Sequence, residues 1–129
     1  MLFFMRYWLP VVLLCLLIYV QSAFPSPDMF PPVAWSDKLV HLMVYGLLGA
    51  LFCRAFSGHA RWRGRWGLLF LFGVTAATLY GASDEWHQSF VAQRTAEWAD
   101  FAADFVGSVI GCGLHLAGRF RKMPRPGVS

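Results

Sequence analysis

Four apolar stretches, separated by short polar connections, occupy most of this 129-residue chain. They cover about residues 7–23, 39–56, 66–83 and 99–118. Each approaches the roughly 20 apolar residues that an α-helix needs to cross the hydrocarbon core of a bilayer. Only 14% of the residues are charged and 57% are hydrophobic, a balance that disfavours a soluble fold. We therefore expect an all-α integral membrane bundle of four transmembrane helices, with residues 1–129 forming a single domain.

The first stretch, residues 7–23, has two interpretations. Arg6 precedes it, and Tyr7 and Trp8 stand at the level where membrane proteins carry an interfacial aromatic belt. The basic residue, the apolar run and the small residues that follow also resemble the three regions of a signal peptide. We favour a retained helix, and a cleaved signal peptide is the alternative. Either one leaves the rest of the chain in the same orientation.

Helix boundaries and helix contacts can also be predicted. Four prolines in residues 24–37 stop helix propagation there. Asp37 and Thr95 are the expected N-caps of the second and fourth helices. Small residues recur every four positions on the third and fourth helices, so we expect these two helices to pack closely. The small residues are Gly73, Ala77, Gly81, Ala103, Gly107 and Gly111.

Basic residues are divided unequally between the two ends of the expected helices. Lys38 and Arg94 fall at one end. The other end carries Arg6, Arg54, Arg61, Arg63, Arg65, Arg119, Arg121, Lys122 and Arg125. Because cytoplasmic segments of membrane proteins are enriched in Lys and Arg, both termini are expected to be cytoplasmic. Topology then explains the net charge of +4, and we expect no nucleic-acid partner.

Polar side chains on three of the expected helices reach the same depth in the outer half of the membrane. Asp37, His41 and Tyr45 form one stripe because they are four residues apart, and so do Asp100 and Asp104. A charge at the centre of a membrane helix costs about 2.5–3.5 kcal/mol, so such groups should face one another or a wet cavity. The expected outer-face pocket consists of Asp37, Lys38, His41, Tyr45, Asp84, Glu85, Gln88, Arg94, Asp100 and Asp104. A purely structural polar network is the alternative.

The order of these groups provides a family resemblance. The pattern is Asp37-Lys38, His41 and Tyr45, then Asp84-Glu85 and Gln88, then Arg94, then Asp100 before a glycine-containing helix. It resembles the VanZ-like membrane proteins, named after a protein associated with teicoplanin resistance, over about residues 37–115. One departure is Asp104, where the family pattern favours Asn. The resemblance implies a multi-pass protein of the cell membrane and cell envelope, with an influence on glycopeptide susceptibility.

Three functions fit these residues. We favour a protein that binds a membrane lipid or a lipid-linked envelope precursor by its polar headgroup. The alternative is a membrane-embedded enzyme acting on a lipid-linked substrate, with Glu85 or His41 as general base and Arg94 stabilising negative charge. The ligands of a metal site would be His41, Asp84, Glu85 and Asp104. Such a site is the weakest of the three, since no HExxH-like spacing is present. We therefore expect no metal and no cofactor.

Arg94 has the most specific expected role. It stands in the short connection between the third and fourth helices, close in sequence to five acids. A guanidinium group can bridge two carboxylates through its fork of donors. We expect Arg94 to form such a bridge and to be energetically coupled to Asp104.

Overall fold

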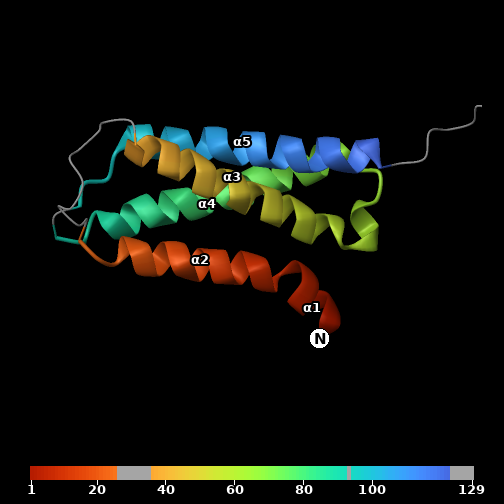
Figure 1. Cartoon of the computed structure of the whole chain (residues 1–129), viewed down its shortest axis with the longest axis horizontal. Coiled ribbons are helices and arrows are strands. Elements are labelled where there is room, and N and C mark those ends of the chain that lie inside the picture. The colour runs from red at the N-terminus through yellow and green to blue at the C-terminus, as the bar shows by residue number, and fades with distance from the viewer. Residues whose placement is uncertain (26–35, 93, 123–129) are drawn as a thin grey trace, which may run out of the picture.

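The computed structural model describes residues 1–25, 36–92 and 94–122. The helices are α1 (Leu2–Tyr7), α2 (Leu9–Ser22), α3 (Ser36–Ser57), the short 3₁₀ helix η1 (Ala60–Trp62), α4 (Trp66–Gln88) and α5 (Trp98–Arg121). No strand forms among the described residues. The long helices lie side by side, and the start of α1 and the end of α5 are at the same end of the bundle (Figure 1).

The helices bear out the all-α fold and the membrane character of the chain. The three helices α3, α4 and α5 are each long and apolar enough to cross a membrane. The outward-facing side chains include large apolar residues such as Met43, Leu79 and Leu114, which are 64–70% exposed. Such a surface suits lipid better than water.

The expected first helix is divided in two at Trp8. Pro10 lacks the N–H that would bond to the carbonyl of Arg6, and its ring crowds that carbonyl, so the helix axis bends there. The resulting α2 has 14 residues and is shorter than the other three long helices. The tyrosine and tryptophan expected at an interface lie at this bend between α1 and α2.

Two expected caps are placed differently by the structure. Asp37 lies within the first turn of α3, and Glu97, not Thr95, occupies the N-cap position of α5, without a capping hydrogen bond from its side chain. Helix α4 continues through the polar residues up to Gln88, where a helix end near Ser83 was expected. The acidic pair that follows Ser83 therefore lies on a helical face and points into the bundle.

The expected close packing of α4 and α5 forms, with Gly73 against Cys112 and Gly81 against Asp104, but α3 and α5 approach more closely still. A Cβ atom added to Gly111 would overlap the carbonyl oxygen of Gly46, and one added to Gly107 would overlap that of Leu42. The two backbones therefore touch directly. The small residues of α4 meet side chains instead, because Gly81 faces Asp104 and Tyr45. Glycines on α3 that were not part of the predicted pattern complete the α3–α5 contact.

Candidate functional site

Asp84 and its hydrogen-bond partners connect α2, α3 and α4 at the polar end of the bundle. The Tyr45 hydroxyl donates to Asp84 Oδ2 at 3.3 Å, and Gln88 Nε2 donates to the same oxygen at 3.0 Å. Gln88 Nε2 also lies 3.3 Å from the hydroxyl of Ser22 on α2. All four side chains are buried, and Oδ2 of Asp84 accepts both hydrogen bonds.

Asp104 is the most deeply buried acid of the described residues, with no exposed surface. Its Oδ1 lies 2.8 Å from His41 Nδ1 on α3, and its main-chain carbonyl accepts a hydrogen bond of 2.7 Å from the Ser108 hydroxyl. The other carboxylate oxygen, Oδ2, is buried and has no hydrogen-bond partner among the described residues. This oxygen faces α4, since it would lie 2.8 Å from a Cβ atom on Gly81.

Lys38 connects the N-terminal ends of α3 and α5. Its Nζ lies 2.8 Å from Asp100 Oδ1 and 3.0 Å from Glu97 Oε2. Asp100 is buried, whereas the Glu97 side chain is 50% exposed. Solvent therefore screens the ion pair with Asp100 less than the one with Glu97. The main-chain N–H of Glu97 donates to Glu85 Oε2 at 3.1 Å. Glu85 Oε1 is buried without a hydrogen-bond partner among the described residues.

Arg94 does not form the expected bridge between carboxylates. It donates from Nε to the carbonyl oxygen of Phe24 at 3.1 Å and from a terminal nitrogen to that of Gln21 at 3.0 Å. Within the described ranges no carboxylate is in ion-pair contact with it. The physical reason is local, because carbonyls in the last turn of α2 and just beyond it lack intrahelical partners and attract a nearby cation. Lys38 is the residue that meets the acids instead.

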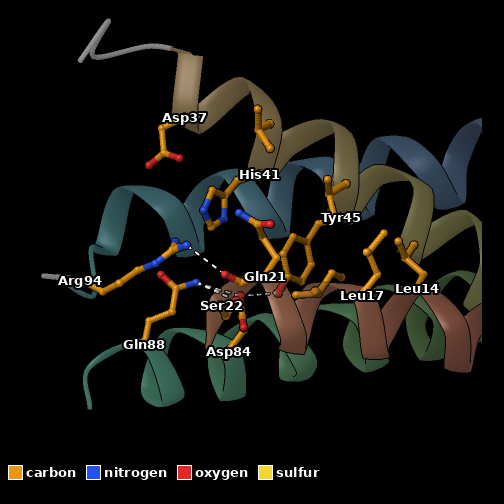
Figure 2. A pocket seen from close by; sticks show the side chains of 13 residues that line it. Leu14, Leu17, Gln21, Ser22, Asp37, His41, Tyr45, Asp84, Gln88 and Arg94 are labelled. Atoms are coloured by element: carbon orange, nitrogen blue, oxygen red, sulfur yellow. Dashed lines mark hydrogen bonds between the residues drawn. The ribbon is translucent and has the colours of Figure 1, made fainter. Parts of the chain in front are cut away.

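A cavity of about 300 Å³ opens between α2, α3 and α4 beside these groups. Figure 2 shows polar side chains gathered at one end and apolar side chains at the other. Its polar lining is Gln21, Ser22, Asp37, His41, Tyr45, Asp84, Gln88 and Arg94. Its apolar lining is Leu14, Leu17, Ile18, Val40 and Val44.

The expected pocket residues are divided between this cavity and the acids buried beside it. Six of the ten line the cavity, namely Asp37, His41, Tyr45, Asp84, Gln88 and Arg94. Glu85 and Asp104 instead meet His41 within the bundle, and Asp100 is held by Lys38. The cavity lining from α2 was missed by sequence reasoning, because residues 7–23 showed only an apolar run with no polar stripe.

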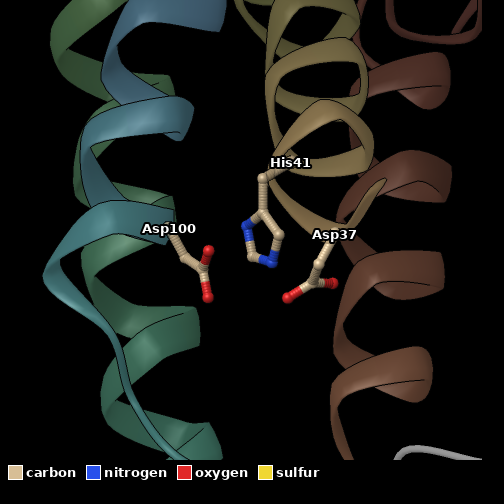
Figure 3. Close-up of side chains that lie close together, drawn as sticks. All are labelled: Asp37, His41 and Asp100. Carbon is tan, nitrogen blue, oxygen red and sulfur yellow. The ribbon is translucent and has the colours of Figure 1, made fainter. Parts of the chain in front are cut away.

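His41 stands at the centre of two groups that have the donor types of a metal site. The side chains of His41, Glu85 and Asp104 offer three ligand atoms within 4.8 Å of one another. Asp37, His41 and Asp100 form a second such group (Figure 3). Imidazole nitrogen with carboxylate oxygens is a donor set used by divalent transition metals.

Comparison with known proteins gives one match. A family model described as VanZ/LLP1 matches residues 4–119, nearly the whole described chain. No curated protein and no solved structure matches this chain.

Proposed function

The chain belongs to the VanZ/LLP1 family, and from that membership and the geometry of its cavity we propose that it binds a lipid by its polar headgroup at the outer face of the cell membrane. The bound molecule is a membrane lipid or a lipid-linked envelope precursor, and the family resemblance connects this activity with glycopeptide susceptibility.

The amphipathic lining of the α2–α3–α4 cavity is the observation that carries this proposal. Its polar end offers a guanidinium, an imidazole and an amide, which are groups that bind phosphate and sugar oxygens. Its apolar end is lined by aliphatic side chains of α2 and α3, which suit an acyl or prenyl chain. A volume of about 300 Å³ is at the lower limit for small-molecule sites and fits a headgroup with the first part of its chain.

We propose four membrane crossings, with α1 and α2 together forming the first. The family match begins at residue 4 and so includes both helices. Helix α2 is also joined to α4 by the Tyr80 hydroxyl, which donates to the Cys15 carbonyl. These contacts support a retained helix over a cleaved signal peptide.

The proposed orientation places both termini in the cytoplasm and the cavity outside. Arg54, Arg119 and the arginines near η1 lie at the end of the bundle opposite the buried acids, as the positive-inside rule requires. Fusion of a phosphatase that works only outside the cytoplasm tests this. Fusions after Pro31 and after Ala92 are expected to be active, and fusions after Gly64 and after Ser129 to be silent. Activity after Ser129 would overturn the orientation.

Binding is tested by mass spectrometry of lipids that copurify with the protein in a mild detergent. We expect one lipid class to be retained by the wild type and lost from His41→Ala and Gln88→Ala, with His59→Ala at the opposite end as matched control. The same substitutions should abolish any effect on teicoplanin susceptibility while membrane abundance stays near that of the wild type. Equal retention by all variants would contradict the proposal. Chemical conversion of the lipid during incubation would establish the enzyme alternative.

A further inference from the structure

We propose that His41, Glu85 and Asp104 bind one divalent transition-metal ion between α3, α4 and α5. Each helix contributes one ligand, and neither Glu85 nor Asp104 lines the lipid cavity. This inference does not rest on lipid binding.

The positions of the ligand atoms suit a single ion. The three side chains each offer one atom within 4.8 Å of the others, and His41 Nδ1 is 2.8 Å from Asp104 Oδ1. Ligand atoms that each lie about 2.0–2.2 Å from a Zn²⁺ ion are at most roughly 4.4 Å from one another. Small side-chain rotations would therefore bring these three atoms to ligand distance from a single ion. Three helices therefore converge on one point with the donor types that such ions prefer.

Two buried carboxylate oxygens provide independent support. Glu85 Oε1 and Asp104 Oδ2 have no hydrogen-bond partner among the described residues, although the two residues are only 8% and 0% exposed. Both residues face the α4–α5 contact, because Glu85 is one turn beyond Gly81 and Asp104 Oδ2 lies against Gly81. A buried carboxylate oxygen without a partner is costly, and ligation removes that cost.

Charges around the site also favour a cation. Asp84, Glu85, Asp100 and Asp104 are buried at this end of the bundle. Among the described residues, Lys38 is paired with Asp100 and Glu97. His41 is the group in contact with Asp104. Tyr45 and Gln88 are neutral donors, so they stabilise the carboxylate of Asp84 without cancelling its charge. Among the described residues no cation is in ion-pair contact with Asp84 or Glu85, so a bound metal ion would offset the excess of carboxylates.

The second group, Asp37 with His41 and Asp100, is the weaker candidate. Asp37 is exposed and Asp100 is already paired with Lys38, so neither provides a buried oxygen in need of a partner. Figure 3 shows that the two carboxylates flank the His41 ring. We therefore place the ion with Glu85 and Asp104.

The experiment is a Co²⁺ titration of the full chain in detergent after treatment with a chelator, followed by displacement with Zn²⁺. We expect one Co²⁺ per chain, with visible ligand-field absorption that Zn²⁺ removes. Loss of a residue that only hydrogen-bonds to a metal ligand typically weakens metal binding roughly 10- to 100-fold. His41→Gln, Glu85→Gln and Asp104→Asn each remove a ligand, so each should weaken Co²⁺ binding by more than that. Elution volume and helicity are measured for every variant, and His41→Gln and Glu85→Gln suffice if Asp104→Asn does not fold.

Two variants at the same end of the bundle serve as matched controls. His87 stacks on Tyr19, and the Glu97 side chain is half exposed and contacts Lys38, so neither is a ligand here. His87→Ala and Glu97→Gln should bind Co²⁺ like the wild type. Absence of Co²⁺ and Zn²⁺ binding by folded wild type would overturn the proposal. Unchanged binding by folded His41→Gln and Glu85→Gln would also overturn it.

Discussion

The two sides of α3 are packed in different ways. Toward α5 the contact is between backbones, since the carbonyl of Gly46 occupies the space that a side chain on Gly111 would need. Toward α2 the contact is made by side chains, and a cavity of about 300 Å³ is left between them. Direct backbone contact fixes the positions of the buried acids, whereas the looser contact leaves room for a ligand. His41 lies where the two kinds of packing meet.

The largest expected effect comes from adding one methyl group to the close α3–α5 contact. Gly111→Ala would place its Cβ on the Gly46 carbonyl oxygen, and overpacking of this kind costs about 1–3 kcal/mol or more. We expect membrane abundance and thermal stability in detergent to fall sharply. Gly113→Ala on the same helix is the matched control, because nothing lies within 4 Å of its Cβ position. It should be neutral or slightly stabilising, and similar losses in both variants would contradict the tight contact.

A larger residue on the side of α3 that faces α2 and the cavity should weaken lipid binding without affecting folding. Val44 lines the cavity, so Val44→Phe would place a ring in it. We expect at least tenfold weaker retention of the copurifying lipid, about 1.4 kcal/mol, with normal abundance and normal Co²⁺ binding. Leu47→Phe is the control, since Leu47 is 54% exposed on the outer surface of α3. Loss of abundance in Val44→Phe would mean that the cavity cannot accept added volume.

Substitution of Arg94 tests how the end of α2 is held. Its two donors reach the carbonyls of Gln21 and Phe24, and an ammonium group does not reproduce that fork. Arg94→Lys should weaken lipid retention about fivefold, near 1 kcal/mol, because one wall of the cavity loosens. A double-mutant cycle with Asp104→Asn on unfolding should be additive within about 0.5 kcal/mol, since the two residues share no hydrogen-bond partner. A larger coupling energy would restore the originally expected bridge.

The smallest expected effect is at the centre of the α2–α4 contact. Tyr80→Phe removes the hydroxyl that donates to the Cys15 carbonyl, which is also within reach of the intrahelical N–H of Tyr19. The expected loss is therefore less than about 1 kcal/mol in unfolding free energy, measured by thermal denaturation in detergent. Tyr19→Phe is the control, because the exposed Tyr19 side chain stacks on His87 through its ring. A loss of several kcal/mol in Tyr80→Phe would mean that α2 is held more firmly than its contacts indicate.

Much of the site could be predicted because residue spacing on a helix fixes which side chains share a face. The four-residue spacing of Asp37, His41 and Tyr45 predicted that they share one face of α3, and all three line the cavity. Spacing does not state which neighbouring helix that side faces. The glycines of α5 were therefore assigned to α4, although they contact α3.

The partner of Arg94 shows a second limit of sequence reasoning. Proximity in sequence to five acids suggested an ion pair, but the connection between α4 and α5 directs the guanidinium toward the end of α2. Lys38, which is 59 and 62 residues from its partners, forms the ion pairs instead. Pairings between groups so far apart in sequence depend on helix positions that no local pattern encodes.

The sequence by itself determined that the chain is helical, suited to a membrane and polar at one end, because hydropathy and charge act residue by residue. Only the tertiary structure decided that α3 packs directly on α5, that α2 closes a cavity, and that His41 meets Glu85 and Asp104 from two other helices. The physical reason is that apolar burial is nearly non-directional, whereas backbone contact at glycine and ligation by side chains depend on short distances. Those distances are set only when the helices have packed.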